Sequence, residues 1–301
     1  MHQSNVFAGE KIKVALISVG SNASLVVLKL VAGIAMGSVS VISEAIHSAM
    51  DLIASLFAWF AVRESSRPAD FQHKFGHGKF ENISGLAEAL LIFIAAFWII
   101  IEAAHKLLSP AELECAGWGM VVMLVSCAAN IWVSRMLFRT AKKTDSMALL
   151  ADAWHLRADV YTSAGVMFGL LVYWAGEKFV PSVDWKWIDP AAALVVAALI
   201  LKAAYELTRD SIKDLLDNSL PACEEEGILA CARRAGGGKI RFKNLKTRKS
   251  GSVRFINLDI EVNPAMSVRS SHELTDIIAA SIEKKYEGSS VTVHVEPWSG
   301  S

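Results

Sequence analysis

The chain has 301 residues, of which 53% are hydrophobic, and its mean hydropathy is +0.38. That composition is too apolar for an ordinary soluble globular protein. Lysine plus arginine and aspartate plus glutamate both number 30, so the net charge gives no indication of a nucleic-acid partner. The four cysteines show no C-x-x-C spacing, which argues against a cysteine zinc site and against a disulfide framework.

Six apolar runs are long enough to cross a bilayer as helices. They lie at about 14–36, 39–62, 83–107, 117–138, 147–175 and 188–208. No small-residue cleavage site follows the first run, so we expect a retained helix and no cleavable signal peptide. Lysines and arginines are concentrated in the loops on one side, which predicts that both termini are cytoplasmic. We therefore predict an α-helical membrane protein with a six-helix transmembrane domain over residues 1–210.

The composition becomes that of a soluble domain from about residue 211. Amphipathic helices are predicted over 222–235 and 267–286, and strands over 239–249, 253–262 and 291–296. A run of three glycines at 236–238 is expected to end the first of these helices. We predict that residues 211–301 form a small α+β domain with αββαβ order, of the ferredoxin or metallochaperone type.

Two segments in different apolar runs share the pattern acid-Ala-x-His-x-x-x-Asp. They are Glu44–Asp51 and Asp152–Asp159. Because residues four apart lie on one helix face, His47 and Asp51 share a face, as do His155 and Asp159. Two imidazoles and two carboxylates form a ligand set that suits tetrahedral zinc. Ionisable residues inside membrane helices are costly, which makes them candidates for a functional site.

The depth of the two histidines supports a shared site. His47 lies roughly 14 Å into its helix from the outer side, and His155 roughly 16 Å from the inner side, at ~1.5 Å per residue. With a hydrocarbon core ~30 Å thick, both reach the midplane, where transporters hold their cargo. The alternative is a pair of polar clusters that hold helices together. Glu44 and Asp152 lie one turn before the histidines and are candidates for the ion path or for outer partners of the ligands.

The polar loop after the second run contains a second candidate metal site. Asp70, His73 and His77 are closely spaced, and glycines beside His77 allow the loop to curl around an ion. A solvated, charged loop explains the same residues without a metal.

The C-terminal domain contains a third candidate set. His294 and Glu296 lie on the polar face of the last strand, Asp259 on the polar face of another strand, and His272 near the start of a helix. An ordinary solvated sheet face is the alternative interpretation of Asp259, His272, His294 and Glu296.

The chain resembles the cation diffusion facilitator family over nearly its whole length. The residues that carry the resemblance are His47-x-x-x-Asp51, His155-x-x-x-Asp159 and the loop sequence 75–79, Phe-Gly-His-Gly-Lys, which is similar to that of the bacterial zinc/iron exporters. The resemblance implies proton-coupled export of a divalent metal by a homodimer. It also implies a transport site at His47, Asp51, His155 and Asp159.

Further sites follow from the same resemblance. It implies a loop site at Asp70, His73 and His77, and cytoplasmic domains that pair and bind metal between them. It also implies a charge pair, Lys79 with Asp217, that joins the two domains. The match is partial in the tail, where Asn244 and Asp259 stand at positions that are histidine in relatives.

The ligand types also bear on the metal. Related exporters carry two aspartates in the second helix, where this chain has His47 and Asp51. Two histidines and two aspartates favour zinc over the harder manganese ion.

The sequence thus predicts an antiporter of the bacterial inner membrane that exports Zn²⁺, or Cd²⁺, Co²⁺ or Fe²⁺, in exchange for protons. We expect a secondary active transporter and not an enzyme, with the metal as cargo and regulatory ion, no cofactor, and no nucleic-acid partner. One alternative is a metal-sensing membrane regulator without transport. Another is an intramembrane hydrolase with a zinc-bound water, which four protein ligands and the absence of H-E-x-x-H argue against.

Overall fold

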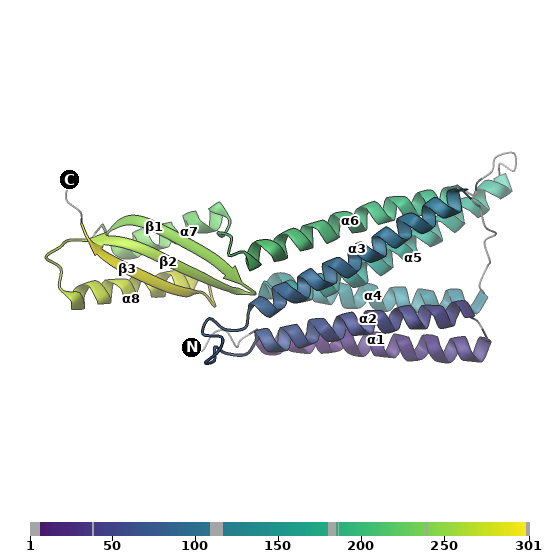
Figure 1. Cartoon of the computed structure of the whole chain (residues 1–301), viewed down its shortest axis with the longest axis horizontal. Helices are drawn as coiled ribbons and strands as arrows, with labels where there is room; N and C mark the ends of the chain where they lie inside the picture. The colour runs from purple at the N-terminus through teal and green to yellow at the C-terminus, as the bar shows by residue number, and fades with distance from the viewer. Residues whose placement is uncertain are drawn as a thin grey trace.

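The computed structural model describes residues 7–37, 39–108, 117–179, 185, 187–238 and 240–298. Over these residues it contains a bundle of six long helices followed by a small α+β domain (Figure 1). The elements are α1 (Ala8–Met36), α2 (Val39–Ser65), α3 (Lys79–Leu108), α4 (Gly117–Thr144), α5 (Met147–Phe179), α6 (Ile188–Leu215), α7 (Ala222–Gly236), β1 (Arg241–Ser250), β2 (Val253–Val262), α8 (Val268–Lys285) and β3 (Ser290–Pro297).

The six long helices form two groups that run along the long axis of the molecule. Figure 1 shows α1, α2 and α4 on one side and α3, α5 and α6 on the other. Helix α5 contacts α4 in the first group as well as α3 and α6 in the second, and it also touches α2. The predicted ligand helices α2 and α5 therefore meet inside the bundle.

Five of these helices are long and apolar enough to cross a membrane. The helix that falls outside this set is α5, whose first half contains Asp152, Arg157 and Asp159. All six predicted runs lie within helices, but α4 and α6 continue past the predicted ends at 138 and 208 to Thr144 and Leu215. A helix can leave the apolar layer without ending, because its backbone hydrogen bonds lie within the helix.

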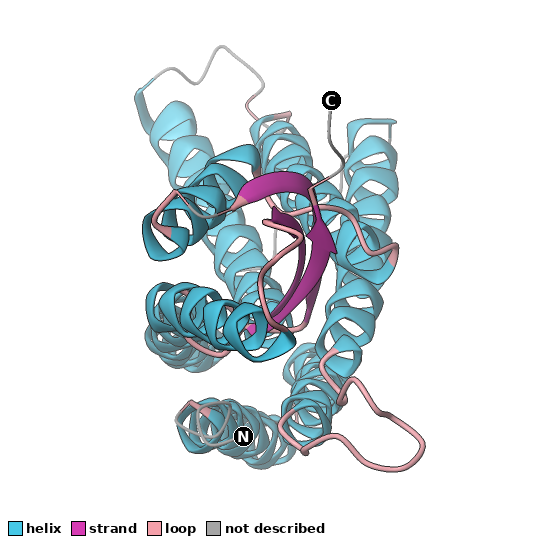
Figure 2. Cartoon of the chain, turned by 90° about the vertical axis from the view of Figure 1, so that its left-hand side faces the viewer, coloured by secondary structure: helices cyan, strands magenta, loops and turns pink. Residues whose placement is uncertain are grey.

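The α+β domain has the predicted αββαβ order. Strands β1 and β2 pair antiparallel, and β3 joins β2 in parallel. Ile256, Leu258 and Ile260 of β2 alternate with polar residues and are fully buried against Ile228 of α7 and Ile278 of α8. Both helices therefore cover the same face of the sheet, as Figure 2 shows for the two helices nearest the viewer. The other face carries no helix of the described chain.

The turn between β1 and β2 reaches into the adjacent end of the bundle. Gly251 in this turn has φ +58°, and its N–H donates to Oδ1 of Asn82 in α3 over 2.9 Å. Lys249 and Arg254 flank the turn and pair with Asp145, between α4 and α5, at 2.8 and 3.2 Å. The hairpin thus ties the α+β domain to two separate parts of the bundle.

A charge pair and a buried ion pair complete this junction. Lys79 lies 3.0 Å from Asp217, so the pair implied by the resemblance is present. Deeper in the bundle, Nζ of Lys11 lies 2.6 Å from Oε1 of Glu81, and both residues are buried. Ser65 of α2 also donates to Glu81, at 2.7 Å. The Glu81 carboxylate therefore joins α1, α2 and α3 at the end nearest the α+β domain.

Candidate functional site

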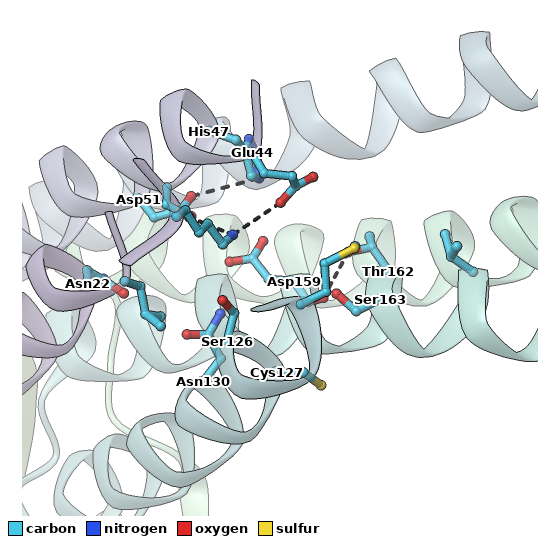
Figure 3. Close-up of a pocket in the computed structure, with 15 residues that line it drawn as sticks. Asn22, Glu44, His47, Asp51, Ser126, Cys127, Asn130, Asp159, Thr162 and Ser163 are labelled. Atoms are coloured by element: carbon cyan, nitrogen blue, oxygen red, sulfur yellow. Dashed lines mark hydrogen bonds and ion pairs between the residues drawn. The ribbon is translucent and has the colours of Figure 1, made fainter. Parts of the chain in front are cut away.

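A cavity of about 220 Å³ lies among α1, α2, α4 and α5. Its lining residues run from the middle of each helix toward the end remote from the α+β domain. The polar ones include His47, Asp51 and Asp159, and Figure 3 shows Asp51 and Asp159 projecting from opposite helices toward the same space. This cavity therefore contains three of the four residues that the sequence predicts for the transport site.

His47, Asp51 and Asp159 each offer a ligand atom, and these atoms lie within 4.8 Å of one another. Nε2 of His47 is 4.0 Å from Oδ1 of Asp51, one helical turn further along α2. Ligand atoms around tetrahedral zinc lie about 3.4 Å apart, given metal–ligand bonds of about 2.0–2.1 Å. A contraction of about 1 Å, within the reach of side-chain rotation, would bring the three onto one ion.

His155 contacts this group of three through Asp51. Its Nε2 is 3.1 Å from Oδ1 of Asp51, and it does not line the cavity. An ionised Asp51 accepts this hydrogen bond from Nε2–H, so the proton occupies the nitrogen that a metal would bind. The structure therefore brings His47, Asp51 and Asp159 together and holds His155 against Asp51. For His155 to become the fourth ligand, its hydrogen bond to Asp51 must be exchanged for a bond to the metal.

Packed side chains fill the bundle between the candidate site and the α+β domain. An apolar cluster fills that half, with Val62 of α2, Val133 and Leu137 of α4, and Leu149 and Leu156 of α5 each no more than 1% exposed. The cavity described above occupies the other half. The candidate ligands thus lie at the boundary between a packed half of the bundle and a hollow one.

Further acidic residues surround the site. Asp152 is 1% exposed, and its carboxylate interacts electrostatically with His155 and Asp51. Glu88 of α3 is equally buried and interacts electrostatically with Asp152 and His155. Glu88 was not among the residues predicted from sequence, although an acid within the apolar run 83–107 is a signal that could have identified it.

Glu44 has a different environment from Asp152, although both precede a histidine by one turn. Glu44 lines the cavity (Figure 3). Its Oε2 lies 3.1 Å from Nζ of Lys29 in α1. Lys29 also donates to Oγ of Ser48 at 2.8 Å. The carboxylate of Glu44 is therefore neutralised by a lysine from the neighbouring helix.

The loop residues Asp70, His73 and His77 also come together within 4.8 Å. Nδ1 of His73 is 3.4 Å from Oδ1 of Asp70, and Nε2 of His77 is 3.3 Å from Oδ2. The backbone N–H of His73 donates to Asp70, which lowers the pKa of that carboxyl and favours its ionised form. His77 is buried, and its Nδ1 has no hydrogen-bond partner in the described chain. This loop can supply one carboxylate and two imidazoles to an ion.

The predicted residues of the α+β domain are less closely gathered. Asp259 and His294 are neighbours in the register of β2 and β3, and Nε2 of His294 lies 3.7 Å from Glu296. Glu296 also pairs with Lys243, while His272 pairs with Asp276 in α8, on the other face of the sheet. Within the described part of one chain, these four residues form no group of three potential ligands. A metal site that uses all of them needs ligands from a second chain or a rearrangement.

The comparisons with known proteins cover both domains. Residues 15–216 match the family model of the cation efflux transmembrane domain, and residues 220–298 match that of the cation efflux protein cytoplasmic domain. Together the two models extend over both the helical bundle and the α+β domain.

Several curated proteins are similar over nearly their full length. The uncharacterized transporter sll1263 of Synechocystis sp. is 35% identical over 94% of this chain and 89% of its own. The cation-efflux pump FieF is 30% identical in Klebsiella pneumoniae, over 95% of this chain and 92% of its own. FieF of Yersinia enterocolitica is 31% identical over 95% of this chain and 93% of its own.

Among solved structures, CzrB in its zinc form matches 28% of this chain and 97% of its own, with 29% identity and a TM-score of 0.27. The two family models account for the membrane helices and for the cytoplasmic domain. The chain belongs to the cation diffusion facilitator family of cation efflux proteins, as its sequence motifs predict.

Proposed function

We propose that this protein exports a divalent transition metal, with Zn²⁺ as the preferred cargo, from the cytoplasm in exchange for protons. The observation that carries the proposal is the placement of His47, Asp51 and Asp159 in one cavity at the middle of the bundle. The imidazole of His47 and the carboxylates of Asp51 and Asp159, with the imidazole of His155 as the fourth ligand, suit zinc. Cadmium, cobalt and iron(II) are the other candidates. The packed half on one side and the hollow half on the other support an alternating-access mechanism.

Proton coupling follows from the chemistry of the ligands. A histidine binds a metal only through an unprotonated nitrogen, and an aspartate binds as its ionised form. The hydrogen bond between His155 and Asp51 places a proton where the metal would lie. When His155 carries protons on both ring nitrogens, arrival of the metal at Nε2 releases one of them, and its return displaces the metal from His155, so that metal and proton move in opposite directions. The protein then works as a secondary active transporter, and no step of this cycle is an enzymatic reaction.

The remaining sites have accessory roles in this proposal. Asp70, His73 and His77 hold a metal at the cytoplasmic end of the bundle. The α+β domain pairs with that of a second chain to form a homodimer, in which Asp259, His272, His294 and Glu296 contribute to a metal-sensing site. We place the protein in the bacterial inner membrane with both termini in the cytoplasm, on the basis of the distribution of basic residues.

The direct test is metal transport in inverted membrane vesicles with a panel of divalent metals and an imposed pH gradient. We expect zinc uptake that increases when the vesicle interior is acidic. Asp51→Ala and Asp159→Ala should each abolish uptake while the protein remains folded, because each removes one of two charged ligands.

Asp70→Ala is the matched control, since it removes an equivalent carboxylate outside the transport site and should leave substantial uptake. Absence of uptake by the unaltered protein would favour the metal-sensing regulator instead. Uptake that ignores the pH gradient would exclude proton exchange while leaving transport intact.

A further inference from the structure

Lys29 is an unusual residue in the wall of the cavity. It lies about 10 Å from the outer end of α1 at ~1.5 Å per residue, within the depth of the hydrocarbon layer. Lysines at such depth commonly extend toward the membrane surface. Lys29 instead is 6% exposed and directs its ammonium group to Glu44 and Ser48 of α2. Among the lining residues that the structure describes, it is the one lysine or arginine.

The charges in the cavity match a divalent cargo only when Lys29 is counted. The carboxylates that line it are Glu44, Asp51 and Asp159. If all three are ionised and the histidines are neutral, the carboxylates sum to −3, and Lys29 brings the total to −2. A divalent cation then makes the cavity neutral. Without Lys29 the bound state would retain a net negative charge, which would hold a metal more tightly in a medium of low dielectric constant.

The position of the lysine also allows it to compete with the metal. Lys29 pairs directly with Glu44 and interacts electrostatically with Asp159. Glu44 lies one turn from His47, on the side toward the outer end of α2. An ammonium group in this position can turn from one carboxylate to the next within the same cavity, whereas a fully solvated lysine would contribute little through the intervening water.

We infer, on the basis of the transport function proposed above, that Lys29 is a tethered counter-ion of the transport site that competes with the metal for its carboxylates. Glu44 is the residue that holds this counter-ion away from the ligands. Lys29 lowers the metal affinity and so favours release on the outer side, and Glu44 limits this effect. Lys29 and Glu44 are thus positioning residues whose effects on metal binding have opposite signs.

The test is calorimetric zinc titration of the purified full-length protein in detergent, in a background that carries Asp70→Ala and His294→Ala to remove binding by the loop and by the α+β domain. Lys29→Met should tighten zinc binding about tenfold or more and slow zinc release, because it removes a positive charge from a poorly screened site. Glu44→Gln should weaken binding to a similar degree, because the freed ammonium turns toward the ligands. The double variant should return to within a few fold of the parent protein, since its net charge is again −2.

Alternative roles predict other patterns. If the pair only joined α1 to α2, both single variants would weaken binding or leave it unchanged, and the inference would be overturned. If Glu44 were itself a ligand, the double variant would stay as weak as Glu44→Gln, with the same consequence. Lys29→Arg retains the charge and should bind zinc like the parent. If Lys29→Met does not fold, Lys29→Gln supplies the neutral variant.

Asp51→Ala separates this inference from the proposed function. Its zinc signal should disappear, which establishes that the titration reports on the cavity. If Asp51→Ala binds zinc like its parent, the proposed transport site is wrong. If Asp51→Ala abolishes binding while Lys29→Met has no effect, only the role of Lys29 is excluded.

Discussion

Replacing Lys11 by methionine should destabilise the membrane domain far more than replacing an ordinary surface lysine. Lys11 lies 2.6 Å from Glu81, and the two side chains are 6% and 0% exposed. Methionine keeps the length of the side chain but leaves the carboxylate without its counter-ion. Breaking a buried ion pair by removing one partner costs about 3–5 kcal/mol, because the remaining charge is neither hydrated nor paired.

The neighbours of Glu81 reduce this cost only in part. Its carboxylate keeps hydrogen bonds from the hydroxyl groups of Ser65 and Ser146. A hydrogen bond to a charged group contributes about 1.5–3 kcal/mol, but a hydroxyl carries no full positive charge. We therefore expect a loss of about 3 kcal/mol for Lys11→Met. The double variant Lys11→Met/Glu81→Gln has no buried charge. Its loss in the free energy of unfolding should fall to about 1 kcal/mol, because replacing both members of a buried ion pair by neutral groups costs little.

The assay is reversible unfolding of the purified protein in mixed micelles with increasing SDS. Lys143→Met is the matched control, because Lys143 also pairs with a glutamate, Glu10, at 2.7 Å, but with side chains 56% and 38% exposed. Exposed pairs contribute about 0–1 kcal/mol. Equal losses for Lys11→Met and Lys143→Met, or a double variant as unstable as Lys11→Met, would refute the reasoning from burial.

Three further outcomes follow from the junction and the loop. Gly251→Ala should lower the free energy of unfolding by about 1–3 kcal/mol in the same titration, because φ is +58° and the new Cβ would lie 2.5 Å from a backbone oxygen of the loop before α3. Partial burial raises the pKa of Asp217, but hydrogen bonds from Lys79 and Arg248 outweigh burial and hold the pKa below its ordinary value. Because the folded-state pKa is the lower one, this stabilisation is present above about pH 4 and is lost as the pH falls further, and unfolding of Asp217→Asn should lack that acid-side decline. Asp70→Ala should reduce the number of zinc ions bound per chain by one in equilibrium dialysis, and an unchanged number would exclude the loop as a zinc site.

The fold was predictable because apolar length and alternation are local properties of the sequence. The six helices and the strands of the α+β domain lie where hydrophobic patterns place them. The ends of α4 and α6 were predicted too early because the apolar run stops at the membrane boundary while the helix continues. Polar residues such as Asp145 and Asp214 belong to contacts with the hairpin, and those contacts depend on tertiary packing that no local pattern encodes.

The candidate site was predictable in its residues but not in its contacts. Helical spacing places His47 with Asp51 and His155 with Asp159, but it does not show which atoms meet across the two helices. The hydrogen bond from His155 to Asp51 depends on the rotation of α5 against α2. For the same reason, the contact of Glu44 with Lys29 could not be predicted, and Glu44 was recognised only as a residue one turn before His47.

The side to which the cavity opens could not be predicted from these residues. In an alternating-access cycle the same ligands face each side of the membrane in turn, and such states commonly differ by only a few kcal/mol. Sequence patterns select ligand types and depth, which both states share. The difference lies in packing, here the apolar cluster around Leu137 and Leu149 on one side of the ligands and the cavity on the other. A conformation that opens the other side must separate this cluster, whose residues come from α1, α2, α4 and α5, while the carboxylates of Asp51 and Asp159 remain within reach of one ion.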